Sequence, residues 1–323
     1  MMRLRGFGGR FAIVVTMTLV VLLLPLPQGL TDPGKRALAA FVFTGSIFAL
    51  QPVSLPFASL MASVALVLLG VADSSQAFVV LSRPIIVLIL GSLFLAESLR
   101  KHGITRRMAL ASIVVSGGEL DRLLLGMMTI AALLSMWMEN TATTAVLIPV
   151  VLTISNQITD KERAREVTVL LVLGIAYAAS LGGMVTVTGS SSNAVASGFL
   201  AEILPWTFLD WVRYGLPAFV FVFPLTWYLL MRLVPVGLSR MDISLARDEL
   251  ANLGPLKAVE WEIVAVLNVT VLMWMAGSYM EPALGLPSTA VSPAVVSMAA
   301  VAYMALREII VWEDVKGVSW GMF

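Results

Sequence analysis

The sequence predicts an all-α protein that crosses a membrane several times. Of its 323 residues, 59% are hydrophobic and 13% are charged, whereas soluble domains carry about 25% charged residues. The apolar residues form continuous stretches, and lipid accepts such stretches as helices because each backbone N–H must be paired within its own segment. Most of the 21 Lys and Arg residues lie between these stretches, as expected for loops that face the cytoplasm.

The first apolar stretch predicts a transmembrane helix within residues 1–36. It follows Arg3, Arg5 and Arg10, which places the amino terminus in the cytoplasm of a multi-pass protein of the cell membrane. A secretory signal would begin in the same way, but no small-residue cleavage site follows closely, so a retained helix is favoured. The nine apolar stretches are residues 11–24, 37–50, 55–71, 77–95, 123–154, 167–187, 214–233, 263–279 and 289–306.

A re-entrant hairpin is predicted over residues 120–157. The preceding residues 98–118 are basic and then apolar, which predicts a helix lying in the inner interface. As one helix, residues 123–154 would span about 48 Å, against about 30 Å of hydrocarbon. Their centre is a polar island, residues 139–144. Two half-length helices that enter and leave on the same side are the simplest geometry.

The charge distribution supports the hairpin independently. With the amino terminus in the cytoplasm, Arg107 and Lys161 both fall on the inner side only if the run between them returns to the side it left. A single crossing would instead move Lys161, Arg163 and Arg165 outside.

A broken helix is predicted over residues 167–204. Residues 182–193 are rich in glycine and hydroxyl side chains and follow an apolar segment, which is typical of an unwound helix whose carbonyls coordinate a cation. Two alternatives stay open: a close-packing face of small residues, or a loop outside the membrane.

The order of elements suggests an inverted repeat. Residues 37–240 form the first repeat, residues 241–262 form a cytoplasmic linker or a second surface helix, and residues 263–323 begin a second repeat of opposite orientation. This arrangement is typical of secondary transporters. In this register the second repeat is incomplete, so we expect the chain to be a fragment or an early-terminated product.

The hairpin tip concentrates oxygen ligands. A carboxylate at the bilayer centre costs about 2.5–3.5 kcal/mol, so such groups usually pair or bind an ion. Oxygen atoms suit a hard cation such as Na⁺, and helix amino termini at a break can point N–H groups at an anion. Hydrogen bonding between helices is the alternative. The oxygen-bearing residues are Ser135, Glu139, Asn140, Thr141, Thr143 and Thr144.

Several functions are excluded or disfavoured. The chain has no cysteine and no phosphate-binding Gly-Lys-Ser/Thr loop, which argues against thiolate metal sites and ATP drive. An intramembrane hydrolase would need a catalytic pair at membrane depth. We expect Glu139 to be the only buried carboxylate, and His102 is the only histidine. We therefore expect no enzyme, no cofactor besides a coupling ion, and no nucleic-acid partner.

Two segments resemble the divalent anion/sodium symporters, which transport dicarboxylates, citrate or sulfate. Residues 134–145 read LSMWMENTATTA and are similar to the first hairpin of that family. Residues 174–184 read GIAYAASLGGM and, with residues 188–193, look like its broken fifth helix. The resemblance is strong over residues 85–198 and implies a homodimer.

The resemblance also implies roles for particular residues. The implied cation site, for Na⁺, consists of Ser135, Asn140 and the backbone at Gly189. We add Glu139 to this site, because a carboxylate there would strengthen Na⁺ binding, although it would also repel a dianion. The implied substrate site consists of Asn140, Thr141, Ser190 and Ser191. Two departures from the family pattern stand out: Glu139 replaces the serine of a Ser-Asn-Thr motif, and Ser191-Ser192 replaces a frequent proline pair.

These expectations combine into Na⁺-coupled symport of a divalent anion by alternating access. Proton coupling through Glu139 is one alternative. A non-transporting partial protein is the other, because the second repeat is incomplete.

Overall fold

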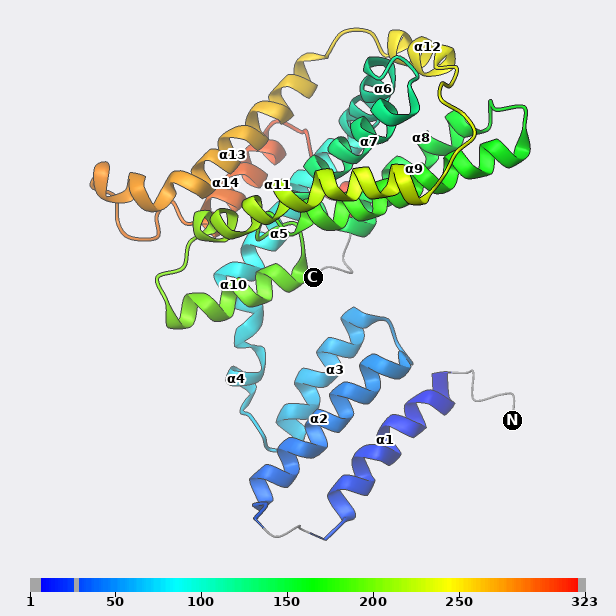
Figure 1. Cartoon of the computed structure of the whole chain (residues 1–323). Coiled ribbons are helices and arrows are strands. Elements are labelled where there is room, and N and C mark those ends of the chain that lie inside the picture. Colours follow the sequence, from blue (N-terminus) through cyan, green and yellow to red (C-terminus); the bar gives the residue numbers. More distant parts are fainter. Residues whose placement is uncertain (1–6, 26–28, 319–323) are drawn as a thin grey trace. The chain divides into compact units, whose positions relative to one another are not determined.

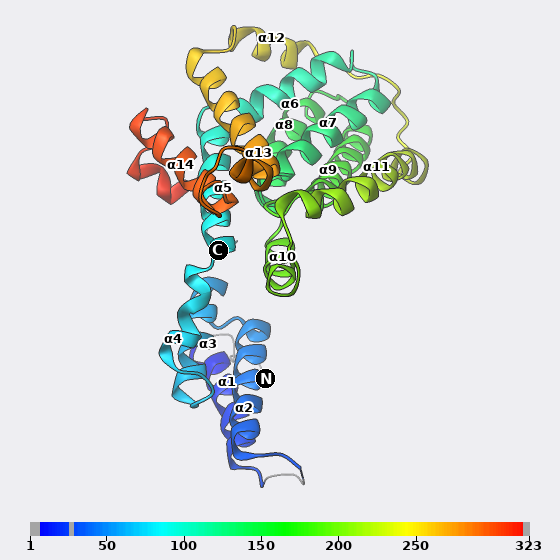
Figure 2. The same cartoon turned by 90° about the vertical axis from the view of Figure 1, so that its left-hand side faces the viewer.

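The computed structural model describes residues 7–25 and 29–318. Their regular structure is helical, apart from one isolated antiparallel bridge between Glu119 and Arg240. The chain divides into two compact units, one up to Ile86 and the other from Val87 onward. Figures 1 and 2 show the helices of each unit from two directions. The predicted all-helical class is confirmed.

The first unit is a small helical bundle. Its helices are α1 (Phe7–Leu23), α2 (Asp32–Leu50), α3 (Leu55–Leu68), α4 (Ser74–Phe78) and the 3₁₀ helix η1 (Val79–Ser82). Helix α2 packs against both α1 and α3, around Val14, Ile47 and Ala58. The hydroxyl of Thr31 accepts a hydrogen bond from the Gly34 amide, which fixes the start of α2.

The apolar stretch 77–95 is not a single helix. It contains the end of α4, η1 and most of α5 (Pro84–Lys101). The ring of Pro84 disfavours helical backbone at Arg83, while proline is well tolerated in the first turn of a helix. The new helix therefore starts at the proline.

The second unit contains residues 120–157 and 167–204, over which the sequence predicts a hairpin and a broken helix. After α5 its helices are α6 (Ile104–Val115), α7 (Leu120–Ser135), α8 (Asn140–Ser155), α9 (Lys161–Gly183), α10 (Ser191–Ile203), α11 (Phe208–Leu233), α12 (Ser244–Asn252), α13 (Ala258–Ala283), α14 (Pro293–Leu306) and the 3₁₀ helix η2 (Trp312–Gly317).

Helix α9 is the centre of this unit. It packs along α7 and along α8, and the shared core includes the fully buried Leu124, Met128 and Leu171. At Gly182 a Cβ atom would overlap the backbone of Ala132 on α7. The missing side chain lets α7 and α9 approach closely near their carboxyl ends, so both helices stop at the same place in the fold.

The linker after α11 is attached to α6. Arg106 pairs with Glu249 of α12 at 2.8 Å, and Arg107 donates to the carbonyl oxygens of Leu253 and Gly254. The linker contains the helix α12.

Three helices in the described part of the chain are long and apolar enough to cross a membrane: α9, α11 and α13. The remaining apolar stretches form shorter helices, among them α3, α8 and α14. Proline shortens two of them, because α3 has Pro56 in its first turn and α14 begins at Pro293.

Candidate functional site

The candidate site is formed where two helical runs are interrupted. The first break, residues 136–139, separates α7 from α8, and the second break, residues 184–190, separates α9 from α10. Each of the two restarting helices has an extended N-cap residue, Glu139 for α8 and Ser190 for α10, and neither side chain caps its helix. The first N–H groups of α8 and α10 are therefore not satisfied by their N-cap side chains.

The second break holds the first break in place. The hydroxyl groups of Thr186 and Thr188 both donate to the carbonyl oxygen of Met136, the latter at 3.1 Å. Both threonines are buried, so these bonds form away from solvent, where an unpaired hydroxyl would cost about 1–3 kcal/mol. Because Thr186 also accepts from the Gly189 amide at 3.1 Å, one side chain links the two breaks.

Oxygen atoms from both breaks converge at this point. The Ser135 hydroxyl, fully buried, donates to Oδ1 of Asn140 at 2.6 Å. A Cβ atom at Gly183 would overlap Asn140 Oδ1, and one at Gly189 would overlap the Gly183 carbonyl and come within 2.7 Å of the Ser135 carbonyl. The Asn140 amide oxygen and the Ser135 and Gly183 carbonyl oxygens therefore lie close together, which is the oxygen-rich arrangement that a hard cation requires.

The direction of the helices adds an electrostatic asymmetry. The carboxyl ends of α7 and α9 bring partial negative charge to the breaks, and the amino ends of α8 and α10 bring partial positive charge. Carbonyl groups favour a cation, and free N–H groups favour an anion. One small region can thus bind both kinds of ion on different sides.

The structure brings together three of the predicted site residues and leaves others apart. Ser135, Asn140 and Gly189 meet at the breaks. Glu139 is partly buried and accepts from the Thr141 hydroxyl at 3.1 Å, so its carboxylate is turned toward a residue of the predicted substrate group. Thr141 and Ser191 are exposed, and Ser190 is partly buried; no hydrogen bond joins Thr141 to either serine among the described residues.

Some contributors were missing from the predicted site. Thr186 and Thr188 belong to the glycine-rich stretch, yet nothing in their spacing indicates that they bind the Met136 carbonyl some 50 positions earlier. Asn193 donates to the carbonyl oxygens of Gly183 and Thr186, each at 2.8 Å. The sequence signal that could have identified Asn193 is its position in the first turn of α10. A side-chain amide in a first turn can donate to carbonyl groups of the preceding break.

Aromatic side chains of α11 and α13 pack near Trp137 in the first break. The ring of Trp137 lies 6.2 Å from that of Trp274 on α13, which in turn lies 5.2 Å from Phe208. Trp274 is almost fully buried. Helix α13 therefore contacts the tip between α7 and α8 through this aromatic pair.

The expectation that Glu139 is the only buried carboxylate is wrong. Glu97 and Glu260 are 4% and 5% exposed, whereas Glu139 is only partly buried. Glu97 is paired with Arg100, and Glu260 with Arg107 at 3.3 Å. Both lie at helix ends beside an arginine, which is how a buried carboxylate is usually stabilised.

Known proteins are similar to this chain over most of its length. A family model described as the sodium:sulfate symporter transmembrane region matches residues 8–323. An uncharacterized transporter of Haemophilus influenzae is 28% identical over 295 residues, which cover 89% of this chain and 62% of the relative.

Two further relatives carry functional names. A Na(+)/citrate cotransporter of Rattus norvegicus is 26% identical, covering 79% of this chain and 55% of the relative. The sodium-dependent dicarboxylate transporter SdcS of Staphylococcus aureus is 24% identical, covering 94% and 62%. The chain thus spans 55% to 62% of the length of these relatives.

Proposed function

The chain belongs to the sodium:sulfate symporter family, and from this premise we propose that it serves Na⁺-coupled symport of a divalent anion, such as a dicarboxylate, citrate or sulfate. The observation that carries the proposal is the meeting of the two breaks at Ser135, Asn140, Gly183 and Gly189. It puts cation-binding oxygens next to two helix amino termini. The named relatives are sodium-dependent carriers of citrate and dicarboxylates.

The proposed cation site uses Ser135, Glu139, Asn140 and Gly189. Ser135 and Asn140 already lie in hydrogen-bond contact at 2.6 Å, so binding Na⁺ requires little movement of these two side chains. Preorganisation of this kind lowers the cost of binding. A bound Na⁺ would reduce the negative charge of the tip and allow a dianion to approach Glu139.

The proposed substrate site uses Asn140, Thr141, Ser190 and Ser191. These residues start α8 and α10, whose amino ends carry partial positive charge. Thr141 and Ser191 are exposed, and the Thr141 hydroxyl would exchange its hydrogen bond with Glu139 for one with the anion. Neither the cation nor the anion role requires a catalytic residue, and we propose none.

In the membrane, we propose that α7 and α8 form a re-entrant hairpin and that α9 and α10 form a broken helix. Oxygen ligands at the breaks would then lie near the bilayer midplane, where discontinuous helices bind substrates and ions in secondary transporters. The amino terminus would be cytoplasmic, residues 263–323 would begin an inverted second repeat, and the protein would act as a homodimer.

Sodium-driven uptake tests the proposal. Proteoliposomes that contain the protein should accumulate labelled succinate, citrate or sulfate when Na⁺ is supplied outside. Asn140→Ala should abolish uptake, and Thr141→Val should raise KM for the anion by about tenfold, as expected for losing one hydrogen bond to a charged group. Thr129→Val is the matched control, because that hydroxyl is exposed on α7 and bonds its own helix.

Uptake that ignores the Na⁺ gradient, or that survives Asn140→Ala, would contradict the proposed mechanism. Sodium-dependent binding of the anion to the purified chain gives a second readout that does not depend on completed transport cycles.

Proton coupling through Glu139 is the second candidate. The observation that favours it is the carboxylate itself, partly buried at the break and bonded to Thr141. If Glu139 carries the proton, Glu139→Ser should flatten the dependence of uptake on external pH. An identical pH profile in the variant and the unaltered protein would exclude this candidate.

A further inference from the structure

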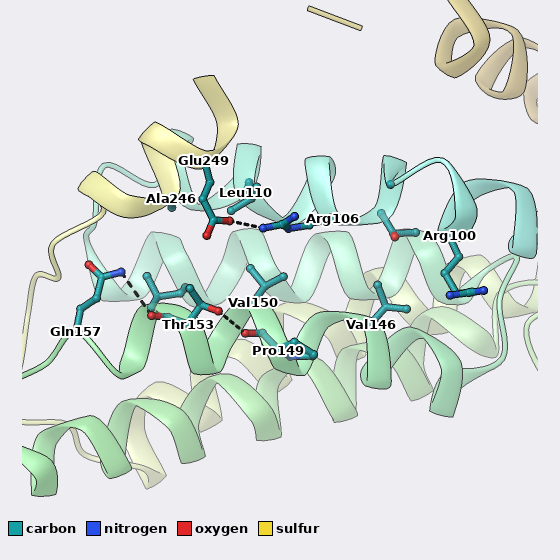
Figure 3. A pocket seen from close by; sticks show the side chains of 13 residues that line it. Arg100, Arg106, Leu110, Val146, Pro149, Val150, Thr153, Gln157, Ala246 and Glu249 are labelled. Atoms are coloured by element: carbon teal, nitrogen blue, oxygen red, sulfur yellow. Dashed lines mark hydrogen bonds and ion pairs between the residues drawn. The ribbon is translucent and has the colours of Figure 1, made fainter. Parts of the chain in front are cut away.

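A cavity of about 370 Å³ opens between α6, α8 and α12, and it does not include either break. Figure 3 shows it from close by, with Arg106 and Glu249 on one wall and Val146, Pro149 and Val150 of α8 on the other. The proposed transport cycle leaves this cavity without a role.

The amino end of α6 lines the cavity and lacks a cap. Its N-cap residue is Gly103, which adopts a left-handed backbone conformation (φ 72°) and has no side chain to accept a hydrogen bond. No acceptor is present among the described residues for the N–H groups of Ile104, Thr105 and Arg106. The first turn of α6 contains no acidic residue, although that end of a helix favours negative charge.

A threonine in the same turn also lines the cavity. Thr105 is only 2% exposed, and its hydroxyl makes no hydrogen bond with another described residue. Free N–H groups and a free hydroxyl beside one cavity indicate that an acceptor, and therefore an anionic oxygen, belongs there.

Two guanidinium groups complete the positive wall. Arg106 uses one terminal nitrogen to pair with Glu249 at 2.8 Å, and Arg100 is paired with Glu97. Their side chains are 57% and 47% exposed. Figure 3 shows Arg106 beside Glu249 and Arg100 at one end of the cavity, near Val146. The carboxylate of Glu249 offsets the charge of Arg106 at the positive end of α6, and the other N–H groups of the guanidinium remain as donors for a ligand.

The opposite wall is apolar. It is formed by one face of α8, with Leu110 of α6 beside it. A hydrated inorganic ion gains nothing from such a wall, whereas a hydrocarbon chain gains about 25 cal/mol per Å² buried. The ligand should therefore carry both an anionic oxygen group and an apolar part.

We propose that this cavity is a second anion site, which binds a phosphate group at the amino end of α6 and an acyl chain against α8. An anionic phospholipid supplies both parts, the phosphate in its headgroup and the acyl chain. The site is independent of the proposed transport function, since none of its residues belongs to the breaks.

Binding measurements on the purified full chain in a non-ionic detergent test the proposal. Native mass spectrometry should give a dissociation constant for phosphatidylglycerol about tenfold lower than for phosphatidylcholine, and inorganic phosphate should compete with phosphatidylglycerol. Thr105→Val and Arg106→Gln should each weaken phosphatidylglycerol binding, by about tenfold for the arginine, because a hydrogen bond to a charged group is worth about 1.5–3 kcal/mol.

Arg163→Gln is the matched control. Arg163 holds the same third helical position in α9, is 51% exposed and also pairs with a carboxylate, that of Asp160. This variant should bind phosphatidylglycerol as the unaltered chain does. Thr105→Val removes one oxygen at nearly constant volume, so it remains informative should Arg106→Gln fail to fold.

Phosphate binding that both variants lose, with no preference for phosphatidylglycerol over phosphatidylcholine, would overturn the assignment to a phospholipid. Equal binding of phosphatidylglycerol by the unaltered chain and both variants overturns the proposal, as does absence of binding of either ligand.

Discussion

At the residue scale, the candidate site depends on two glycines that have no room for a side chain. Gly183 abuts Asn140 Oδ1, and Gly189 abuts the Gly183 carbonyl. Neither adopts a positive φ, so the requirement is close approach of backbone to backbone and not conformational freedom. The glycine pair lets the oxygens of both breaks share one small volume.

Gly183→Ala should therefore impair cation binding. The added methyl group would displace Asn140, and forcing extra atoms into a packed interior costs about 1–3 kcal/mol. We expect the Na⁺ concentration for half-maximal uptake to rise by about tenfold, measured in proteoliposomes at a fixed anion concentration. Gly45→Ala in α2 is the control, because a Cβ there meets nothing within 4 Å. A normal Na⁺ response in Gly183→Ala would contradict the proposed cation site.

At the element scale, helix starts in this fold are of two kinds. The start of α9 is capped by Asp160, whose carboxylate accepts from the Glu162 and Arg163 amides. The starts of α8 and α10 have no such side-chain cap. A capped start stabilises the fold, whereas an open start leaves N–H groups for a ligand.

The two kinds of start predict opposite effects of alanine. Asp160→Ala should lower the free energy of unfolding by about 1 kcal/mol and leave the affinity for the anion unchanged. Ser190→Ala should change stability by less than about 0.5 kcal/mol but weaken anion binding several-fold. Thermal unfolding and sodium-dependent anion binding, measured on the same preparations, check both effects. Equal loss of stability in the two variants would show that Ser190 has a structural role.

At the scale of the whole molecule, the membrane arrangement depends on the hairpin. The linker after α11 is attached to α6 by Arg106 and Arg107, and α8 packs on α6 as well as on α9. In the proposed hairpin, both ends of the α7–α8 pair lie at the same membrane face. A single crossing by residues 123–154 would separate them.

Cysteine labelling tests this arrangement directly, since the chain has no native cysteine. Arg122→Cys, in the first turn of α7, and Lys161→Cys, at the start of α9, should both react with a membrane-impermeant thiol reagent from the cytoplasmic side only. Arg36→Cys, expected outside, is the control and should react from the opposite side. Reaction of Arg122→Cys and Lys161→Cys from opposite sides would exclude the re-entrant hairpin.

Much of the element-level organisation could be predicted from the sequence. The polar island after Met138 and the glycine-rich stretch after Leu181 each interrupt an apolar run, and the structure has a break between helices at both places. Such interruptions are local, because a helix ends where its own residues no longer favour it. For the same reason the helix boundary at Pro84 is visible in the sequence.

The sequence by itself determined the helical membrane class and the presence of two breaks, because composition and helix endings depend on neighbouring residues. Only the tertiary structure decided which groups meet: Thr186 and Thr188 on the Met136 carbonyl, Asn140 against Gly183, and Arg106 on Glu249. Such contacts join residues far apart in the chain, and their geometry follows from how closely α7, α8 and α9 pack. No periodicity within a single helix carries that information.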